Sequence, residues 1–244
     1  RILFVGRIEV RKGVDVLLDA AYRVLERFPE AELHLIGRHN PVEGENESIL
    51  DRHRQRVAGR PELDARVLFH GGLPDDALRR AYADCDLLVL PSKYESFGLV
   101  LTEAMMFSKP VIGVRSGGPL EIVVDGENGF LVPPDDSDAL AEAIGRLVAS
   151  AELRARFGAR GRQIYEQRFT TEIMVANTID CHREVVREHS GSVGLGNVST
   201  SLAGFVRSVC GVSEDDARLA AGELLAPRLP FGVPDYAKTL TALW

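Results

Sequence analysis

Glu95 and Glu103 are separated by seven residues and offer two carboxylates that can accept hydrogen bonds from sugar hydroxyls. Between them, Gly98 has no Cβ, so the backbone there can approach a ligand closely. A helix-compatible run follows. The amides of Phe97, Gly98 and Leu99 then lie at a helix N-terminus, which favours an anion such as phosphate. At a rise of about 1.5 Å per residue, the two carboxyls stand roughly 8–12 Å apart. This layout fits two sugar rings with a diphosphate between them, as in a sugar nucleotide.

A second segment of the chain supplies positive charge. Residues 2–5 form an apolar run that predicts a buried strand, and residues 13–28 carry apolar side chains at helical spacing. Arg7 and Lys12 lie in the loop between the two, at the carboxyl end of the strand, where open α/β sheets bind their ligands. Arginine contacts phosphate through two N–H groups, and lysine acts as a point charge. We therefore expect both side chains to hold the diphosphate beside Glu95.

Short apolar runs alternate with helical patterns along most of the chain. Strands are expected at residues 2–5, 32–36, 66–70, 86–90, 110–114 and 129–132. Helices are expected at residues 13–28, 47–58, 74–84, 98–107, 118–124, 137–149, 151–168 and 170–189. Because the strands are short, continuous apolar runs, the pattern predicts an α/β fold: a Rossmann-like parallel sheet with helices on both faces.

The chain divides into three parts by composition. Residues 1–189 carry the alternating pattern and form the predicted sheet domain. Residues 190–201 are rich in Gly and Ser and are interpreted as a linker, and residues 202–244 as a short, mainly helical C-terminal appendage of unknown role. Since the chain begins inside a strand-like run, we interpret it as a fragment of a longer protein.

Composition narrows the possible partners. The 244 residues carry a formal charge of −7, which disfavours nucleic acid and anionic membranes as partners of the bulk surface. Three cysteines without Cys-x-x-Cys spacing indicate neither a disulfide framework nor a zinc site, and they favour a reducing, cytoplasmic compartment. No apolar run approaches the ~18 residues of a membrane span. No metal site and no cofactor are expected.

Four motifs occur in a fixed order. They are Gly6-Arg7 with Lys12-Gly13, Val67 to Gly71, Pro91-Ser92 through Glu95 to Glu103-Ala104, and Gly117 to Val123 with Asp125 to Gly129. Together they resemble the C-terminal, nucleotide-sugar-binding domain of retaining glycosyltransferases with the GT-B fold, in the large family numbered four. The resemblance covers about residues 1–189.

The resemblance implies a role for each site residue. Arg7 and Lys12 would hold the diphosphate, Glu95 would bind hydroxyls of the donor sugar, and Glu103 would bind the ribose diol. The backbone from Phe97 through Gly98 to Leu99 would contact sugar and phosphate. The base would lie near the ends of the second and third strands. The residues expected there are Gly37, His70 and Gly71.

The resemblance also implies a reaction. A hexosyl group would pass from the nucleotide sugar to an acceptor without a covalent enzyme intermediate, and the leaving phosphate would help deprotonate the acceptor. The acceptor site would belong to an N-terminal domain absent from this chain, so the fragment is expected to bind its donor and to turn over little alone. Two alternatives stay open: a non-catalytic nucleotide- or phosphosugar-binding module, and a GT-B-like sugar-nucleotide epimerase. The base, the donor sugar, the acceptor and the oligomeric state are not specified.

Several other residues are interpreted as structural. Ser108 stands where the family has a helix-ending glycine, so it must accept modest strain or end the helix differently. His53 is expected at the surface, Met105 in the core and Arg154 on a solvated helix face. Lys93 is a minor candidate to join Lys12 at the phosphates.

Overall fold

The computed structural model describes residues 1–39 and 48–189. The expected linker at 190–201, the appendage at 202–244 and residues 40–47, which include the start of the helix expected at 47–58, lie outside the described residues. The chain divides into two compact units, Arg1–Glu166 and Gln167–Trp244, and each is described by itself. The domain boundary at residue 189 stays a prediction.

A six-stranded sheet forms the centre of the first unit. Its strands are β1 (Ile2–Val5), β2 (Leu33–Ile36), β3 (Val67–Gly71), β4 (Leu87–Leu90), β5 (Val111–Val114) and β6 (Gly129–Val132). All neighbouring strands are parallel, in the order β3-β2-β1-β4-β5-β6. In the central strand, Ile2 pairs with Leu33 on one side and with Leu87 on the other. The predicted strands are confirmed to within one residue at each end.

Helices lie between the strands and after the last of them. They are α1 (Val14–Arg27), α2 (Ile49–Arg56), α3 (Pro61–Asp64), α4 (Asp75–Asp84), α5 (Leu99–Met106), α6 (Pro119–Ile122), α7 (Ser137–Ala149), α8 (Ala151–Arg168) and α9 (Thr171–His189), with a 3-10 turn, η1 (Val10–Lys12). The predicted helices are all present. Helix α3 and the turn η1 were not predicted, because elements of three or four residues are too short to show an apolar period.

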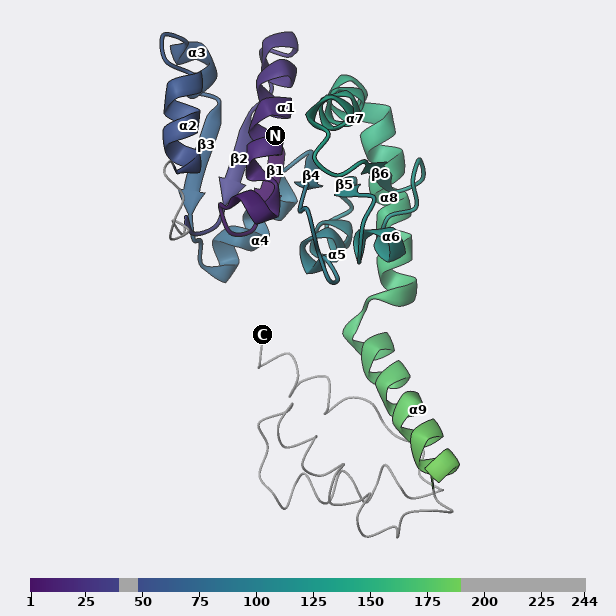
Figure 1. Cartoon of the computed structure of the whole chain (residues 1–244). Coiled ribbons are helices and arrows are strands. Elements are labelled where there is room, and N and C mark those ends of the chain that lie inside the picture. The colour runs from purple at the N-terminus through teal and green to yellow at the C-terminus, as the bar shows by residue number, and fades with distance from the viewer. Residues whose placement is uncertain (40–47, 190–244) are drawn as a thin grey trace. The chain divides into compact units, whose positions relative to one another are not determined.

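The two faces of the sheet bury alternate side chains. Ile2 and Phe4 belong to a core cluster with apolar residues of α1, α2, α3 and α7, which cover one face. Figure 1 shows α4 and α5 against the opposite face of the sheet. There Leu3 and Leu88 are fully buried. The predicted Rossmann-like architecture, with helices on both faces of a parallel sheet, is therefore confirmed.

Helix α5 ends in a strained residue. Ser108 adopts a left-handed conformation with φ of 56°, so it takes the strain that a glycine would avoid. Its amide donates to the carbonyl of Met105 at 3.0 Å, and the Lys109 amide donates to Ala104 at 3.0 Å. Helix α8 packs against this turn, since a Cβ on Gly158 would lie 2.0 Å from the Ser108 carbonyl oxygen. The helix is therefore followed by a left-handed residue, as expected for glycine, although the residue here is serine.

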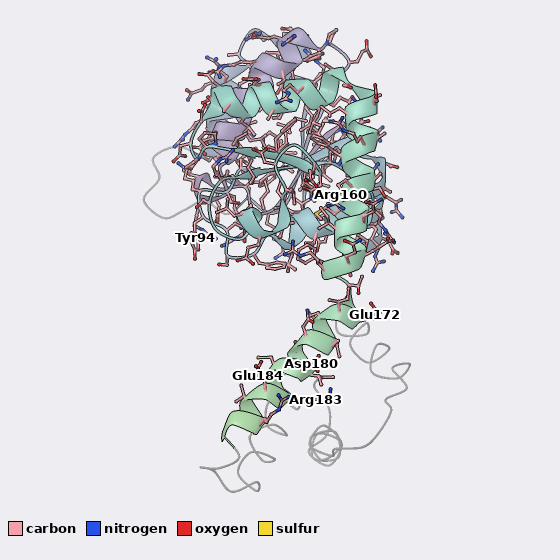
Figure 2. The ribbon with its side chains drawn as sticks, turned by 90° about the vertical axis from the view of Figure 1, so that its right-hand side faces the viewer. Tyr94, Arg160, Glu172, Asp180, Arg183 and Glu184 are labelled. Atoms are coloured by element: carbon pink, nitrogen blue, oxygen red, sulfur yellow. The ribbon has the colours of Figure 1, made fainter. Side chains whose placement is uncertain are left out.

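In the second unit the described residues form helix α9. Charged side chains are spread along it, as Figure 2 shows for Glu172, Asp180, Arg183 and Glu184. Arg183 pairs with Asp180 at 3.2 Å, one turn away. Across residues 1–39 and 48–189, no helix combines the length and apolar character needed to cross a bilayer. The cytoplasmic location stays a prediction.

Candidate functional site

The side chains of Lys12 and Glu95 meet at the carboxyl edge of the sheet. Lys12 Nζ donates to Glu95 Oε2 at 2.6 Å, although the two residues are far apart in sequence. Both side chains are mostly buried, at 17% and 18% exposure, so solvent screens the pair only partly. The Ser92 hydroxyl lies 3.5 Å from the same carboxylate oxygen. The structure thus brings together two residues that the sequence predicted to share a site.

Tight backbone packing holds these two loops together. Gly13 has φ of 68° and begins α1, and a Cβ there would lie only 2.0 Å from the carbonyl oxygen of Pro91. Any other residue would force the β1–α1 and β4–α5 loops apart. The amide of Lys93 also donates to the carbonyl of Arg11 at 3.2 Å. Lys12 and Glu95 are therefore positioned by contact between the backbones that carry them.

Gly98 starts the helix that follows Glu95. Its φ of 100° and ψ of 50° turn the chain sharply into α5, and a Cβ there would meet the Leu101 side chain at 3.2 Å. Glycine has no side chain to cap the helix, and the Leu101 amide of the first turn donates to the Gly98 carbonyl at 2.9 Å. Phe97 and Leu99, on either side, are exposed at 42% and 53%. This turn supplies the anion-favouring helix start expected from the sequence.

The loop between β5 and α6 contacts the backbone of the turn that carries Glu95. The amide of Gly118 donates to the carbonyl of Glu95 at 2.8 Å, and a Cβ on Gly117 would lie 2.4 Å from that same carbonyl oxygen. A Cβ on Gly118 would meet the Phe97 carbonyl oxygen at 2.2 Å. Tyr94, by contrast, projects outward at 63% exposure, as Figure 2 shows. The two glycines of the fourth motif thus fix the backbone of the Glu95 loop.

Arg7 lies in the same loop as Lys12 and has a different partner. Its guanidinium stands 3.5 Å from Glu9 Oε1, and Arg11 stands 3.1 Å from the same oxygen. Glu9 is buried, whereas the two arginines are each 52% exposed. A buried carboxylate therefore holds two exposed cations in the loop that also carries Lys12. Sequence reasoning selected Arg7 but not Glu9, whose role shows only in the fold.

Glu103 lies inside α5 and contacts α4. The hydroxyl of Tyr82 donates to Glu103 Oε2. Sequence reasoning selected Glu103 but missed Tyr82, because no local spacing connects residues on two different helices. Tyr82 can be recognised as a neighbour of Glu103 only from the packing of α4 beside α5.

The ends of the first three strands come close together. Gly37 follows β2 with φ of 151°, and a Cβ there would lie 1.8 Å from the carbonyl oxygen of Gly6. The Gly37 amide donates to the carbonyl of Gly71 at 2.8 Å. Gly71 itself has φ of 67° and ends β3. These glycines let backbone strands approach at the edge where the sequence predicted the base.

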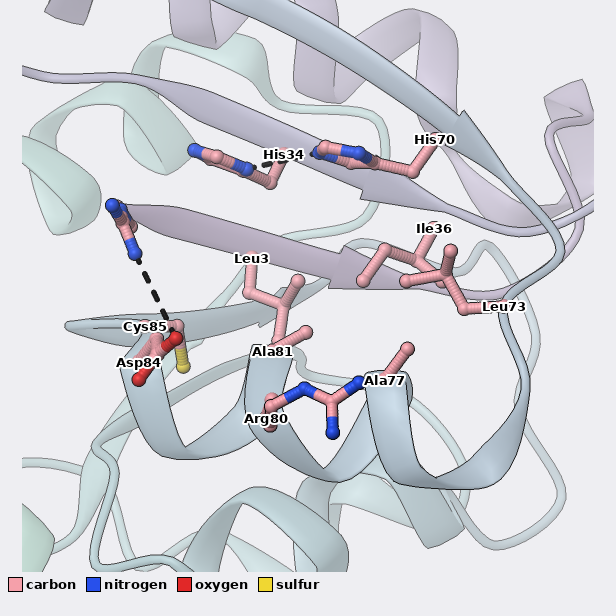
Figure 3. A pocket seen from close by; sticks show the side chains of 11 residues that line it. Leu3, His34, Ile36, His70, Leu73, Ala77, Arg80, Ala81, Asp84 and Cys85 are labelled. Atoms are coloured by element: carbon pink, nitrogen blue, oxygen red, sulfur yellow. Dashed lines mark hydrogen bonds and ion pairs between the residues drawn. The ribbon is translucent and has the colours of Figure 1, made fainter.

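His70 points to the sheet face rather than to the Lys12–Glu95 pair. Its ring stacks on His34 with 5.2 Å between ring centres, and its Nε2 lies 3.0 Å from His34 Nδ1. Figure 3 shows both rings beside a hollow of about 200 Å³ between the sheet and α4, which Ile36 and Leu73 also line. Burial lowers the pKa of His34, while a hydrogen bond to Glu32 opposes that shift. Whether His70 touches a ligand stays a prediction.

Two of the side chains interpreted as structural differ from expectation, and Lys93, the minor candidate for the phosphates, has an acidic partner. His53 is buried, not at the surface, because it contacts the Tyr22 hydroxyl at 2.8 Å and Asp64 at 3.0 Å. Arg154 is not simply solvated: it donates to the last carbonyls of α7 at 2.8 Å and 2.9 Å. Lys93 pairs with Asp135 at 2.7 Å.

Met105 is fully buried, as expected. Within the part of the chain that the structure describes, no three His, Cys, Asp or Glu side chains are grouped to hold a metal ion.

A parallel sheet in this strand order, with a lysine–glutamate pair at its carboxyl edge beside a helix start, defines the Rossmann-like domain that forms the C-terminal half of GT-B proteins. The chain belongs to the glycosyl transferases group 1 family, whose model matches residues 1–164.

Its curated relatives are longer proteins. A phosphatidyl-myo-inositol mannosyltransferase of Mycobacterium leprae is 37% identical over 66% of this chain and 41% of its own length. A D-inositol 3-phosphate glycosyltransferase of Streptomyces griseus is 33% identical over 77% of this chain and 39% of its own. This chain thus spans about two fifths of the length of these relatives.

Solved structures show the same fold. HepE of Anabaena in complex with UDP is 31% identical with a TM-score of 0.63, over 74% of this chain and 48% of that one. The same protein has also been solved with UDP-glucose. The C-terminal domain of LpcC, a glycosyl transferase group 1 family protein of Francisella tularensis, is 26% identical with a TM-score of 0.62, over 70% of this chain and 86% of that domain.

Proposed function

We propose that this chain is the donor-binding part of a retaining glycosyltransferase, which transfers a sugar from a nucleoside-diphosphate sugar to an acceptor. The observation that carries the proposal is the 2.6 Å contact between Lys12 and Glu95 beside the start of α5. A cation, a carboxylate and the positive end of a helix in one place match the three chemical parts of such a donor. Membership of the family and the UDP and UDP-glucose held by HepE support the same class of ligand.

In this proposal the ion pair is the resting state of the site. Without a ligand, Glu95 neutralises Lys12. When a diphosphate binds, Lys12 turns to its oxygens and the Glu95 carboxylate is released to accept hydrogen bonds from the sugar. Arg7, which pairs with Glu9 in the same loop as Lys12, would add a second cation to the diphosphate. The pair thus exchanges one internal contact for two contacts with the donor.

The same groups would assist bond breaking. Negative charge grows on the diphosphate as the sugar leaves, and Lys12, Arg7 and the amides from Phe97 to Leu99 are placed to stabilise it. Glu95 holds the sugar and is not the nucleophile in this scheme. The acceptor and the remaining catalytic contacts would come from an N-terminal domain outside this chain. We therefore expect the 244-residue chain to bind donor and to turn over little or nothing alone.

Calorimetric titration of the Glu95→Gln variant tests the division of roles. UDP and UDP-glucose are the first probes, followed by the ADP and GDP counterparts. Because the glutamine no longer competes for Lys12, the variant should bind the bare diphosphate at least as tightly as the wild type. It should bind the sugar nucleotide about 10- to 100-fold more weakly, since hydrogen bonds to a charged group are lost.

Glu142→Gln is the matched control, because it removes the same charge from an exposed position on α7. It should leave both affinities unchanged. If a folded wild-type sample binds no nucleoside diphosphate at millimolar concentration, the proposed function is wrong. If Glu95→Gln binds the sugar nucleotide as tightly as the wild type, the nucleotide site is still supported, but Glu95 is not part of it. In that case a non-catalytic nucleotide-binding module becomes the better description.

A further inference from the structure

Tyr82 is a buried residue of α4 that contacts the proposed site. Only 3% of the residue is exposed, and its hydroxyl donates to Glu103 Oε2 on the neighbouring helix α5. Nothing in the local sequence pairs these two positions, since one helix lies before β4 and the other after it. The contact therefore depends on how the two helices pack against the sheet.

The phenol is fixed in place by its surroundings. Its ring stacks on Phe107 with 5.9 Å between ring centres and 7° between ring planes. The Cys85 thiol donates to the Tyr82 carbonyl at 3.3 Å, next to the end of α4. Burial first, and then the adjacent carboxylate of Glu103, raises the pKa of Tyr82. The hydroxyl therefore stays protonated and serves Glu103 as a donor throughout the physiological range.

This donor restricts what Glu103 can do. An ionised carboxylate accepts hydrogen bonds only, and one acceptor position on Oε2 is taken by Tyr82. The remaining positions on both oxygens can still accept from two neighbouring hydroxyls. Because the glutamate is held in advance, less side-chain entropy is lost when such a pair of hydroxyls binds.

We propose that Tyr82 is a positioning residue that orients Glu103 to select a ribose, with both of its hydroxyls, over a 2′-deoxyribose. This inference rests on the proposed function, in which Glu103 binds the ribose of the donor. It goes further by assigning the selectivity to a residue of α4 that does not touch the ligand. Tyr82 acts through Glu103, so its removal should change which sugar is preferred and not merely how tightly the diphosphate binds.

The test compares UDP with 2′-deoxy-UDP by calorimetry on the 244-residue chain. The wild type should prefer UDP by about tenfold or more, because the deoxy ligand would leave a half-buried acceptor position of Glu103 unpaired. Tyr82→Phe keeps the ring on Phe107 and deletes only the hydroxyl. We expect it to reduce that preference to about threefold or less, mostly by weakening UDP.

Tyr22→Phe is the control for loss of a buried phenol. Tyr22 is also 3% exposed and contacts His53 Nδ1 at 2.8 Å, on α1 and away from Glu103. This variant should lose stability and keep the wild-type preference for UDP. A merely structural role for Tyr82 would make the two phenylalanine variants behave alike.

A double variant covers the case in which Tyr82→Phe does not fold. Tyr82→Phe combined with Glu103→Gln removes both the donor hydroxyl and the charged acceptor, so no half-buried carboxylate is left without its hydrogen-bond donor. The double variant should show the same preference for UDP over 2′-deoxy-UDP as Glu103→Gln alone. A difference between them means that Tyr82 acts by another route and overturns the inference. An unchanged preference in folded Tyr82→Phe overturns it as well, while the proposed function stands. If the wild type binds no nucleotide, both fall together.

Discussion

At the scale of single residues, the candidate site is made of side chains that already have hydrogen-bond or ion-pair partners in the absence of a ligand. Lys12 and Glu95 hold each other, Glu9 holds Arg7, and Glu103 accepts from a buried tyrosine. Such contacts keep charged groups satisfied in a partly buried place, where an unpaired charge is costly. They also pre-set the geometry that a donor would meet.

His34 gives a pH-dependent prediction at this scale. Burial lowers the pKa of His34 below its ordinary value of 6.5, and the neighbouring His70 and Arg1 charges act in the same direction. The unfolded chain therefore takes up the proton more readily than the folded one. The contribution of His34 to stability is present above about pH 6.5 and is lost as the pH falls toward the lowered value.

Urea unfolding at about pH 7.5 and 5.5 measures this effect. The free energy of unfolding should fall more in the wild type than in His34→Gln over this interval. His182→Gln, on α9, removes a histidine from the second unit and should follow the wild type. Equal pH slopes for all three proteins would show that His34 has no part in the acid sensitivity.

At the scale of elements, glycines decide how closely the helices approach the rest of the fold. Gly158 of α8 lies against the backbone of Ser108, where a Cβ would stand 2.0 Å from the carbonyl oxygen. Gly145 of α7 has only an ordinary contact, since the nearest atom to its Cβ position is in Phe28 at 3.7 Å. The two helices therefore tolerate an added methyl group very differently.

Alanine at each position should change stability in opposite directions. Gly158→Ala forces α8 away from the turn and should lower the free energy of unfolding by about 1–3 kcal/mol. Gly145→Ala removes a flexible residue from a helix interior and should raise it by about 0.5–1 kcal/mol. Urea unfolding of both variants beside the wild type measures the difference. A stabilised Gly158→Ala would show that the packing of α8 against the turn at Ser108 is looser than described.

Most of the elements could be predicted from local sequence, and the physical reason is clear. Most strands are short runs of apolar residues buried on both faces, as in β4 and β5, so their pattern does not depend on their partners. Gly98 could also be recognised, because a close approach of the backbone is a local requirement, whereas the contact of Gly13 with Pro91 could not. The burial of His53 and the pairing of Tyr82 with Glu103 could not, since each needs side chains from another element.

At the scale of the whole molecule, the described core lies entirely in the first unit. Every buried hydrophobic residue in the ranges 1–39 and 48–189 falls between Ile2 and Ile164. The residues of the candidate site fall in the same interval. The fold and the proposed nucleotide site should therefore not require the last 55 residues predicted to form the linker and appendage, or about a fifth of the chain.

A chain ended after His189 tests this expectation. It should keep the far-ultraviolet circular dichroism signal per residue of the sheet domain, a cooperative unfolding transition, and the UDP affinity of the 244-residue chain to within about threefold. Calorimetry and urea unfolding on both lengths provide the comparison. A loss of affinity in a folded, shortened chain would give residues 190–244 a role at the site.

The position of β1 in the sheet sets an order of assembly. This strand forms the middle of the sheet, and its Ile2 pairs with Leu33 on one side and with the more distant Leu87 on the other. The longer loop is entropically harder to close, so contacts with β2 are favoured first. The other edge of β1 then stays unpaired until β4 has been synthesised and can pair with it. Because Lys12 follows β1 and Glu95 follows β4, we expect their contact to form together with this later pairing.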